Sequence, residues 1–215
     1  MRVSELFIIL KPAYSREEDV YLELGGNVML IQEREIILKN GQKVILKSAT
    51  ATDAEGICEH RYRTSAETHF MARYPEEGRL NTEKMRDGLK SLEEDAQAFL
   101  VTAYLDGKII GDAGVTKVRE LMKYCHRAYF GMSILKEYCE LGLGSAMMET
   151  AIAQARENGF EQIELGVFED NPRAIHLYEK FGFEKYGTHP RAFKLKDGTY
   201  RDEIIMVKFL QEEMF

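Results

Sequence analysis

Residues 129–145 read Tyr-Phe-Gly-Met-Ser-Ile-Leu-Lys-Glu-Tyr-Cys-Glu-Leu-Gly-Leu-Gly-Ser and carry the strongest structural signal in the chain. Their first half continues an apolar segment that predicts a strand over about 127–135. Small and apolar residues then recur every four positions over 144–158, which predicts a helix with one buried face. The sequence therefore predicts a strand, a glycine-bearing loop and a helix in direct succession.

The glycines of this loop favour an anion-binding site. Gly142 and Gly144 let the backbone approach a ligand without a Cβ in the way. The helix that follows presents unpaired N–H groups and the positive end of its dipole, which together suit a pyrophosphate. For the two glycines alone, a tight packing turn is the competing interpretation. Met147 stands where a dinucleotide motif needs its third glycine, and no Walker lysine follows, so both nucleotide classes are disfavoured.

A second signal lies at 171–183, which reads Asn-Pro-Arg-Ala-Ile-His-Leu-Tyr-Glu-Lys-Phe-Gly-Phe. Asn171 suits the N-cap of a short helix, and Pro172 suits its first position, where a missing N–H costs nothing. Gly182 suits its end. Tyr178 is either a core aromatic or a tyrosine whose hydroxyl reaches a site.

The remaining elements frame these two signals. Asn40-Gly41 and Asp106-Gly107 predict tight hairpins. Capping patterns at Thr52–Glu55 and at Asn81 predict helices between them. Strands are expected near 163–167, 183–188 and 200–210. We expect residues 1–34 to form an extension packed on a single domain, 35–215.

With both motifs in order, the sequence resembles the GNAT superfamily of N-acetyltransferases over roughly residues 35–210. In that family a Q/R-x-x-G-x-G/A loop binds the acetyl-CoA pyrophosphate, and an N-x-x-A-x-x-x-Y-x-x-x-G-F helix supplies the leaving-group tyrosine. This chain reads Cys139-Glu-Leu-Gly-Leu-Gly144 and then the 171–183 segment, and 197–206 is similar to the family's last hairpin. One departure is Cys139, which replaces the Q/R side chain.

The resemblance implies an α/β (α+β) fold. Its central sheet would be mixed, mostly antiparallel and flanked by helices, and it would splay at an acetyl-CoA cleft. It also implies an N-acetyltransferase that uses acetyl-CoA as co-substrate, with no metal. A primary amine, on a small molecule or a protein N-terminus, would attack directly in a ternary complex. Tyr178 would be the general acid, because its reference pKa of ~10 lets it hold a proton for the departing thiolate. The cofactor residues implied are Met132, Ser133, Ile134, Leu135, Cys139, Glu140, Leu141, Gly142, Leu143, Gly144, Ser145, Asn171 and Tyr178.

The general base stays open. Histone-type members of the family use a glutamate on the central strand, and the corresponding position here is Ala128. His126 lies two residues earlier with a side-chain pKa near neutrality, so we take it as a catalytic candidate; a solvent-exposed loop histidine is the competing interpretation. Glu164 and a chain of waters are further options.

Composition restricts the other classes of function. The formal net charge of −7 weighs against nonspecific nucleic-acid binding. No apolar run approaches the ~20 residues of a membrane span, which excludes a membrane partner and predicts a cytoplasmic protein. The three cysteines, an odd number without metal spacing, are expected to be reduced thiols.

The acceptor amine cannot be named from the sequence. Residues 61–79 and 119–126 are expected to shape its site, because loops carry specificity. A protein N-terminus, a polyamine or amino acid, and an antibiotic amine remain candidates, and a homodimer stays open. A non-catalytic acyl-CoA sensor is the alternative function: Tyr178 argues against it, and Ala128 argues for it.

Overall fold

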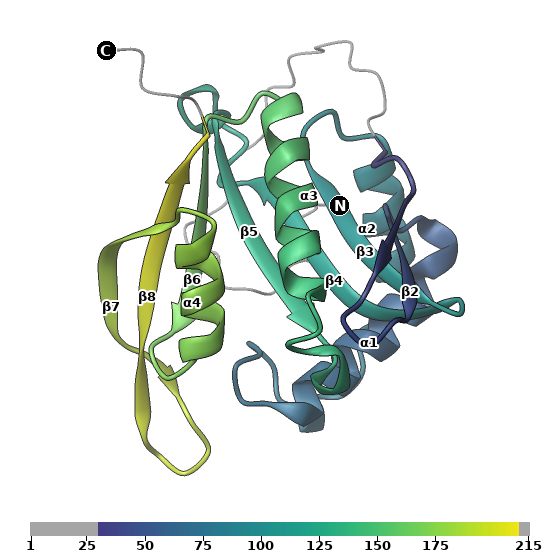
Figure 1. Ribbon diagram of the computed structural model, residues 1–215. Coiled ribbons are helices and arrows are strands. Elements are labelled where there is room, and N and C mark those ends of the chain that lie inside the picture. The colour runs from purple at the N-terminus through teal and green to yellow at the C-terminus, as the bar shows by residue number, and fades with distance from the viewer. Residues whose placement is uncertain (1–29, 211–215) are drawn as a thin grey trace.

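Eight strands form one sheet in the order β1-β2-β3-β4-β5-β6-β8-β7 (Figure 1). The computed structural model describes residues 30–210. All neighbouring strands in it run antiparallel except β5 and β6. The strands are β1 (Arg34–Ile37), β2 (Lys43–Lys47), β3 (Phe99–Leu105), β4 (Lys108–Lys117), β5 (Arg127–Ile134), β6 (Gln162–Phe168), β7 (Glu184–Lys194) and β8 (Tyr200–Phe209). The expected mixed, mostly antiparallel sheet is confirmed.

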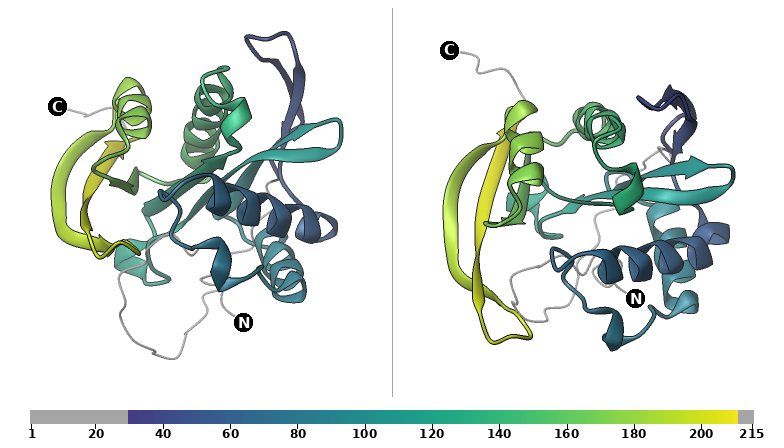
Figure 2. Two further views of the ribbon diagram at one scale, coloured as in Figure 1. Left: turned by 90° about the horizontal axis from the view of Figure 1, so that it is seen from below. Right: turned by 60° about the horizontal axis from the view of Figure 1, so that its bottom comes forward.

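Helices cover both faces of this sheet. One face carries α3 and α4, and the other carries α1 and α2 (Figures 1 and 2). The helices are α1 (Ala54–Glu67), α2 (Thr82–Glu93), α3 (Leu143–Glu157) and α4 (Pro172–Lys180). None of the helices within residues 30–210 is long and apolar enough to cross a membrane.

Turn and cap residues act largely as the sequence predicts. Asp106 and Gly107 both have positive φ, as a two-residue hairpin turn requires. At the first hairpin only Gly41 has positive φ, and the loop is longer than two residues, because Ile37 pairs with Lys43. The first helix is also preceded by a short 3₁₀ turn, so its capping pair is Thr50 with Asp53, two residues before the predicted pair.

Two apolar clusters, one on each face, hold the sheet. The larger lies under α3 and α4 and contains Phe130, Met147 and Leu165, which are at most 1% exposed. The smaller lies under α1 and α2 and is centred on Ile57 and Leu89, both fully buried. The predicted apolar stripes of α2 and α3 are therefore the faces that pack on the sheet.

The sheet opens between its two parallel strands. β5 and β6 pair only through Arg127↔Gln162, Ala128↔Ile163 and Tyr129↔Glu164. Beyond Tyr129, β5 continues on β4 alone, and β6 continues on β8 alone. This confirms the predicted splay and leaves the second half of β5 with one unpaired edge.

The last hairpin is longer than expected. The sequence predicts a strand that ends near Thr188, two residues before Pro190, which has no N–H for a ladder. Instead β7 runs to Lys194, with register shifts between His189 and Phe193 that contain the proline. Arg191 adopts a positive φ of 55° there, and its N–H donates to Asp202 Oδ1 at 2.7 Å. The strand tolerates the proline because β7 is an edge strand.

Residues 1–29 lie outside the described part of the chain, and with them most of the predicted extension. Its last residues are described: Ile31 is 7% exposed and belongs to the larger cluster. Its N–H donates to Ser48 Oγ at 3.0 Å. The boundary at residue 34 stays a prediction.

Candidate active site

A cleft of about 740 Å³ occupies the splay between β5 and β6. Its size lies within the usual range of ~300–1,000 Å³ for small-molecule sites. The second half of β5, the loop before α3, the start of α3, and α4 form one part of it. The end of α1 and the loop after it form another. Ten of the thirteen predicted cofactor residues line the cleft: Met132, Ser133, Ile134, Cys139, Glu140, Gly142, Gly144, Ser145, Asn171 and Tyr178.

The unpaired edge of β5 presents backbone groups to this cleft. Leu135 N–H donates to Ile110 O at 3.1 Å, which marks the odd-numbered residues of β5 as bonded to β4. Backbone groups alternate along a strand, so those of Met132 and Ile134 face the gap. Met132 and Ile134, two of the implied cofactor residues, thus offer free donors and acceptors, whereas Ser133 and Leu135 are engaged with β4.

The start of α3 supplies a second set of donors. Gly142 is its N-cap with φ of 94°, a conformation that favours glycine. The first helical residues, Leu143, Gly144 and Ser145, have no carbonyl one turn earlier to accept from them. A Cβ on Gly144 would lie 3.2 Å from Leu177 Cδ2 and 3.4 Å from Ile134 Cδ1. Glycine therefore keeps both the loop shape and the contact between α3 and α4.

Basic side chains surround these donors. Four lysine and arginine residues line the cleft against two glutamates, namely Lys39, Lys136, Arg173 and Lys180 against Glu67 and Glu140. Arg173, on α4, lies 3.8 Å from Glu140 in the loop. Glu67 Oε2 accepts from the N–H of Lys136 at 2.7 Å and ties the end of α1 to the loop. The positive balance and the free N–H groups fit a phosphate-bearing ligand.

Tyr178 lies on α4 with its ring in the larger apolar cluster. Phe130 and Phe183 contact it at centroid distances of 6.3 and 5.9 Å. The residue is 7% exposed and lines the cleft, and its hydroxyl makes no hydrogen bond to another described residue. Burial raises the pKa of Tyr178 to about 12. The hydroxyl therefore stays protonated near neutrality, and no acceptor within residues 30–210 engages it.

Two of the predicted cofactor residues that line the cleft, Cys139 and Ser133, contact different parts of the protein. Burial raises the pKa of the Cys139 thiol, so it stays protonated near neutrality, and it approaches Leu135 O at 3.7 Å. Ser133 Oγ lies 2.9 Å from Nε2 of the buried His60 on α1. Burial lowers the pKa of His60 to about 4, so this histidine is neutral at pH 7. The pair shows that odd-numbered side chains of β5 point toward α1.

Three predicted cofactor residues do not line the cleft. Leu135 and Leu143 are at most 1% exposed and pack in the larger cluster. Leu141 is half-buried, and its carbonyl accepts from the N–H of Lys39 at 3.0 Å. Asn171 lines the cleft as the predicted N-cap, with Oδ1 accepting from Ala174 N–H at 3.2 Å.

The base candidates from the sequence lie away from the splay. His126 precedes β5 at the end where β5 and β6 are still paired, and its carbonyl accepts from Glu161 N–H at 2.9 Å. At about 3.3 Å per residue, the strand separates it from Phe130 by roughly 13 Å. Glu164 is bound by Arg127, whose Nη2 donates to Oε2 at 2.8 Å. Ala128 is fully buried in the larger cluster. The geometry favours none of these residues as the base.

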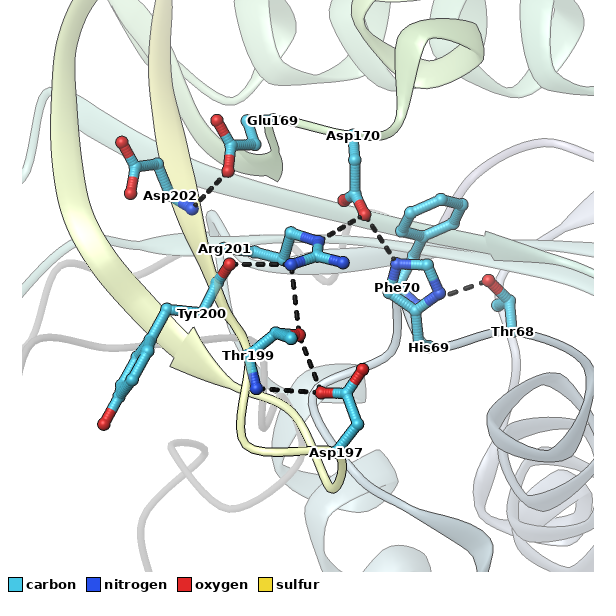
Figure 3. A network of polar contacts seen from close by, with 10 residues as sticks. All are labelled: Thr68, His69, Phe70, Glu169, Asp170, Asp197, Thr199, Tyr200, Arg201 and Asp202. Carbon is cyan, nitrogen blue, oxygen red and sulfur yellow. Dashed lines mark hydrogen bonds and ion pairs between the residues drawn. The ribbon is translucent and has the colours of Figure 1, made fainter.

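A polar network holds the loop after α1 against the far side of the cleft. Asp170 Oδ2 accepts from Arg201 Nε at 2.8 Å and lies 3.0 Å from His69 Nε2 (Figure 3). Burial opposes ionisation of Asp170, but these two partners outweigh it and hold its pKa below the ordinary value. Next to the network, Phe70 contacts Phe168 edge-on at 5.8 Å. The predicted specificity loop therefore reaches the cleft, whereas residues 119–126 do not line it.

One buried acid was missed from the sequence. Glu203, on β8, is 6% exposed and lies against Gly166 of β6, which lines the cleft. Nothing in the Arg201-Asp-Glu-Ile sequence separates it from a surface carboxylate. A usable signal was Gly166, because a glycine inside a strand often marks a close approach by another group.

Comparisons with known proteins agree with this geometry. A profile of the Acetyltransferase (GNAT) family matches residues 60–183. The L-amino acid N-acetyltransferase AaaT of Escherichia coli is 32% identical over 125 residues, which cover 57% of this chain and 70% of that protein.

Solved structures share the fold. A GNAT-family acetyltransferase from Streptococcus pneumoniae superposes with a TM-score of 0.74 at 28% identity, covering 77% of this chain and 99% of that one. A phosphinothricin acetyltransferase from Sinorhizobium meliloti, solved in complex with acetyl-CoA, has a TM-score of 0.69 at 21% identity and covers 80% and 90%. The matched family profile spans more than half of the chain and contains the glycine loop and Tyr178, and the chain therefore belongs to the GNAT family of acetyltransferases.

Proposed function

We propose that this acetyltransferase moves the acetyl group of acetyl-CoA to a primary amine by direct attack in a ternary complex. The observation that carries the proposal is the Tyr178 hydroxyl. It has no hydrogen-bond partner in the described part of the chain, and Tyr178 lines the cleft into which the free N–H groups of α3 point. An acyl-CoA sensor would need the N–H groups, but it has no use for an unpartnered hydroxyl.

The residues around the loop fit the ligand. Backbone N–H groups of Leu143, Gly144 and Ser145 would bind the pyrophosphate, with Arg173 and Lys136 close by. The free backbone groups of Met132 and Ile134 would align the pantetheine arm and polarise the carbonyl. Cys139 stands where the family motif has Q or R. The backbone donors, together with Arg173 and Lys136, would take over the phosphate contacts of that side chain.

Tyr178 would then act when the thiolate leaves. Its raised pKa keeps it protonated across the neutral range, so it can donate to sulfur as the carbon–sulfur bond breaks. The acid works best if water is excluded, and the ring contacts with Phe130 and Phe183 close the cleft behind it.

The residues of the cleft do not identify the acceptor amine, so its class is proposed from the relatives. AaaT, which is 32% identical over 125 residues, is named for L-amino acids. Small amino-acid-like amines are therefore the first acceptors to test, ahead of peptide N-termini, polyamines and aminoglycosides.

The three unpaired thiols, Cys58, Cys125 and Cys139, support a reducing, cytoplasmic location.

Two measurements test this function. Acetyl-CoA and CoA should raise the melting temperature, whereas NAD and ATP should not, because only a ligand of the folded state stabilises it. Thiol release from acetyl-CoA should then depend on an added amine. Stabilisation by acetyl-CoA without thiol release for any amine would instead support the sensor.

A further inference from the structure

The Glu203 carboxylate occupies space that only a glycine provides. A Cβ on Gly166 would fall 1.9 Å from Glu203 Oε1, so the acid lies directly on the backbone of β6. Gly166 itself lines the cleft. Side chains alternate along a strand, and Leu165 and Val167 point into the larger apolar cluster. Gly166 and Glu203 therefore lie on the opposite face of the sheet, the face that carries α1 and α2.

No side chain or backbone N–H of the described residues donates a hydrogen bond to this carboxylate, although buried acids normally have such donors. Its side chain is 8% exposed, and its single ion-pair contact among the described residues is His189 Nδ1 at 3.8 Å. His189 is itself 69% exposed and belongs to the edge strand β7. Burial raises the pKa of Glu203, and His189 opposes this only in part. A buried charge without donors is destabilising, so its presence points to a partner that arrives from outside.

The surroundings define what that partner would be. Phe168, the cross-strand neighbour of Glu203, stacks on Phe193 at 3.7 Å, and both line the cleft. The other ionisable groups near the carboxylate are Tyr129 of β5 and Tyr186 of β7, which its charge affects. A negative group beside an aromatic wall suits a cation carried on an apolar carbon.

Glu203 and Tyr178 lie on opposite faces of the splayed sheet. Tyr178 packs with Phe130 in the cluster under α3 and α4, whereas Glu203 lies against Gly166 on the other face. An acyl group held in the gap would thus have an acid on one side and a carboxylate on the other. Glu203 is not itself among the residues that line the cleft, but Gly166, on which its carboxylate rests, is one of them.

We propose that Glu203 binds the ammonium form of the acceptor amine and is the general base that removes its proton. This inference rests on the proposed acetyl transfer. The carboxylate takes one proton from nitrogen and frees its lone pair, and the nitrogen–carbon bond forms as the carbon–sulfur bond breaks. Tyr178 gives its proton to sulfur and recovers one from the nitrogen, and Glu203 passes its own proton to water. The sum is an amide, a free thiol and one released proton.

This role predicts a specific dependence on pH. If Glu203 accepts the ammonium, kcat/KM of the parent should be flat between the pKa of Glu203 and that of the free amine. Glu203→Gln should react only with the neutral amine, so its kcat/KM should rise about tenfold per pH unit up to the pKa of the amine. At pH 7 we expect a loss of ~10²–10⁴-fold. Acetyl-CoA affinity should stay unchanged.

Stability separates this role from a structural one. Because the folded pKa of Glu203 is raised, the ionised carboxylate reduces the free energy of unfolding as pH rises above its unfolded value. Glu203→Gln should therefore keep or raise the melting temperature at pH 7 while it loses activity. Asp202→Asn is the matched control, because Asp202 is the next residue of β8, faces the other way and binds Arg191 N–H. It should keep the flat pH profile.

The outcomes are distinct. A Glu203→Gln protein that keeps a flat profile within twofold of the parent overturns the role of Glu203 while acetyl transfer stands. A parent that binds acetyl-CoA but acetylates no amine overturns the proposed function, and the base with it. If Glu203→Gln folds poorly, Glu203→Asp replaces it. Aspartate is one methylene shorter, so its carboxylate lies farther from the amine; kcat/KM should fall but the pH profile should stay flat. An unchanged kcat/KM would contradict the proposal.

Discussion

Tyr178→Phe isolates the hydroxyl proposed as the general acid. The substitution keeps the ring and its contacts with Phe130 and Phe183. The hydroxyl makes no hydrogen bond to any residue between 30 and 210, so the free energy of unfolding should change by less than about 1 kcal/mol. With the acid gone, the thiolate must leave unprotonated, and turnover should fall by ~10²–10⁴-fold. That range corresponds to about 3–5 kcal/mol of barrier at 1.36 kcal/mol per tenfold.

The assay is thiol release under saturating acetyl-CoA with the best acceptor found. Acetyl-CoA affinity should stay near that of the parent, because the hydroxyl matters once charge develops on sulfur. With a pKa of about 12, Tyr178 should cause no alkaline fall in parent activity below roughly pH 11. Single-turnover rates replace steady-state rates if product release limits the parent.

A Tyr178→Phe protein that turns over within about twofold of the parent, with chemistry rate-limiting, would refute the acid role. Near-normal turnover together with a clear loss of stability would assign Tyr178 to the core instead. The combination expected here is the reverse: intact stability, intact acetyl-CoA binding and lost turnover.

The remaining predictions concern the loop, the second core and the polar network. Gly142→Val, at a φ of 94°, should sharply weaken acetyl-CoA binding measured by calorimetry. The control Gly159→Val, at the other end of α3 with a φ of 80°, should strain the helix but leave binding unchanged. Equal acetyl-CoA affinities of the two variants would contradict the loop site. Leu89→Ala should lower the free energy of unfolding in urea by roughly 2–5 kcal/mol, because the residue is fully buried, and a loss under about 1 kcal/mol would argue against its place in the core. Asp170→Asn should lower the melting temperature and raise KM for the amine at pH 7. Because the folded pKa of Asp170 is depressed, this difference in stability should begin to shrink as pH falls below about 4 and should vanish below the folded pKa; a difference that does not shrink over this range would rule out the ion pairs as its source.

Local chemistry was strong enough in several elements to be read directly from the chain. Asp106-Gly107 is a tight turn because both residues tolerate positive φ, and Asn171-Pro172 starts α4 because the cap and the fixed proline φ match a helix start. The splay was expected from the resemblance to GNAT proteins rather than from spacing. The predicted end of β7 near residue 188 was wrong: the strand continues past Pro190 to Lys194, because an edge strand with a bulge tolerates a proline.

The sequence by itself determined the strand–loop–helix of residues 129–145 and the candidate hydroxyl of Tyr178, because caps, glycines and periodicity act over a few neighbouring residues. Only the tertiary structure showed that Glu164 is bound by Arg127, that His126 lies beyond the paired end of β5, and that Glu203 rests on Gly166. The partners in these contacts lie tens of residues apart. Whether a carboxylate is neutralised or left free depends on which strands are neighbours and which faces they share, and no local pattern in the chain encodes that.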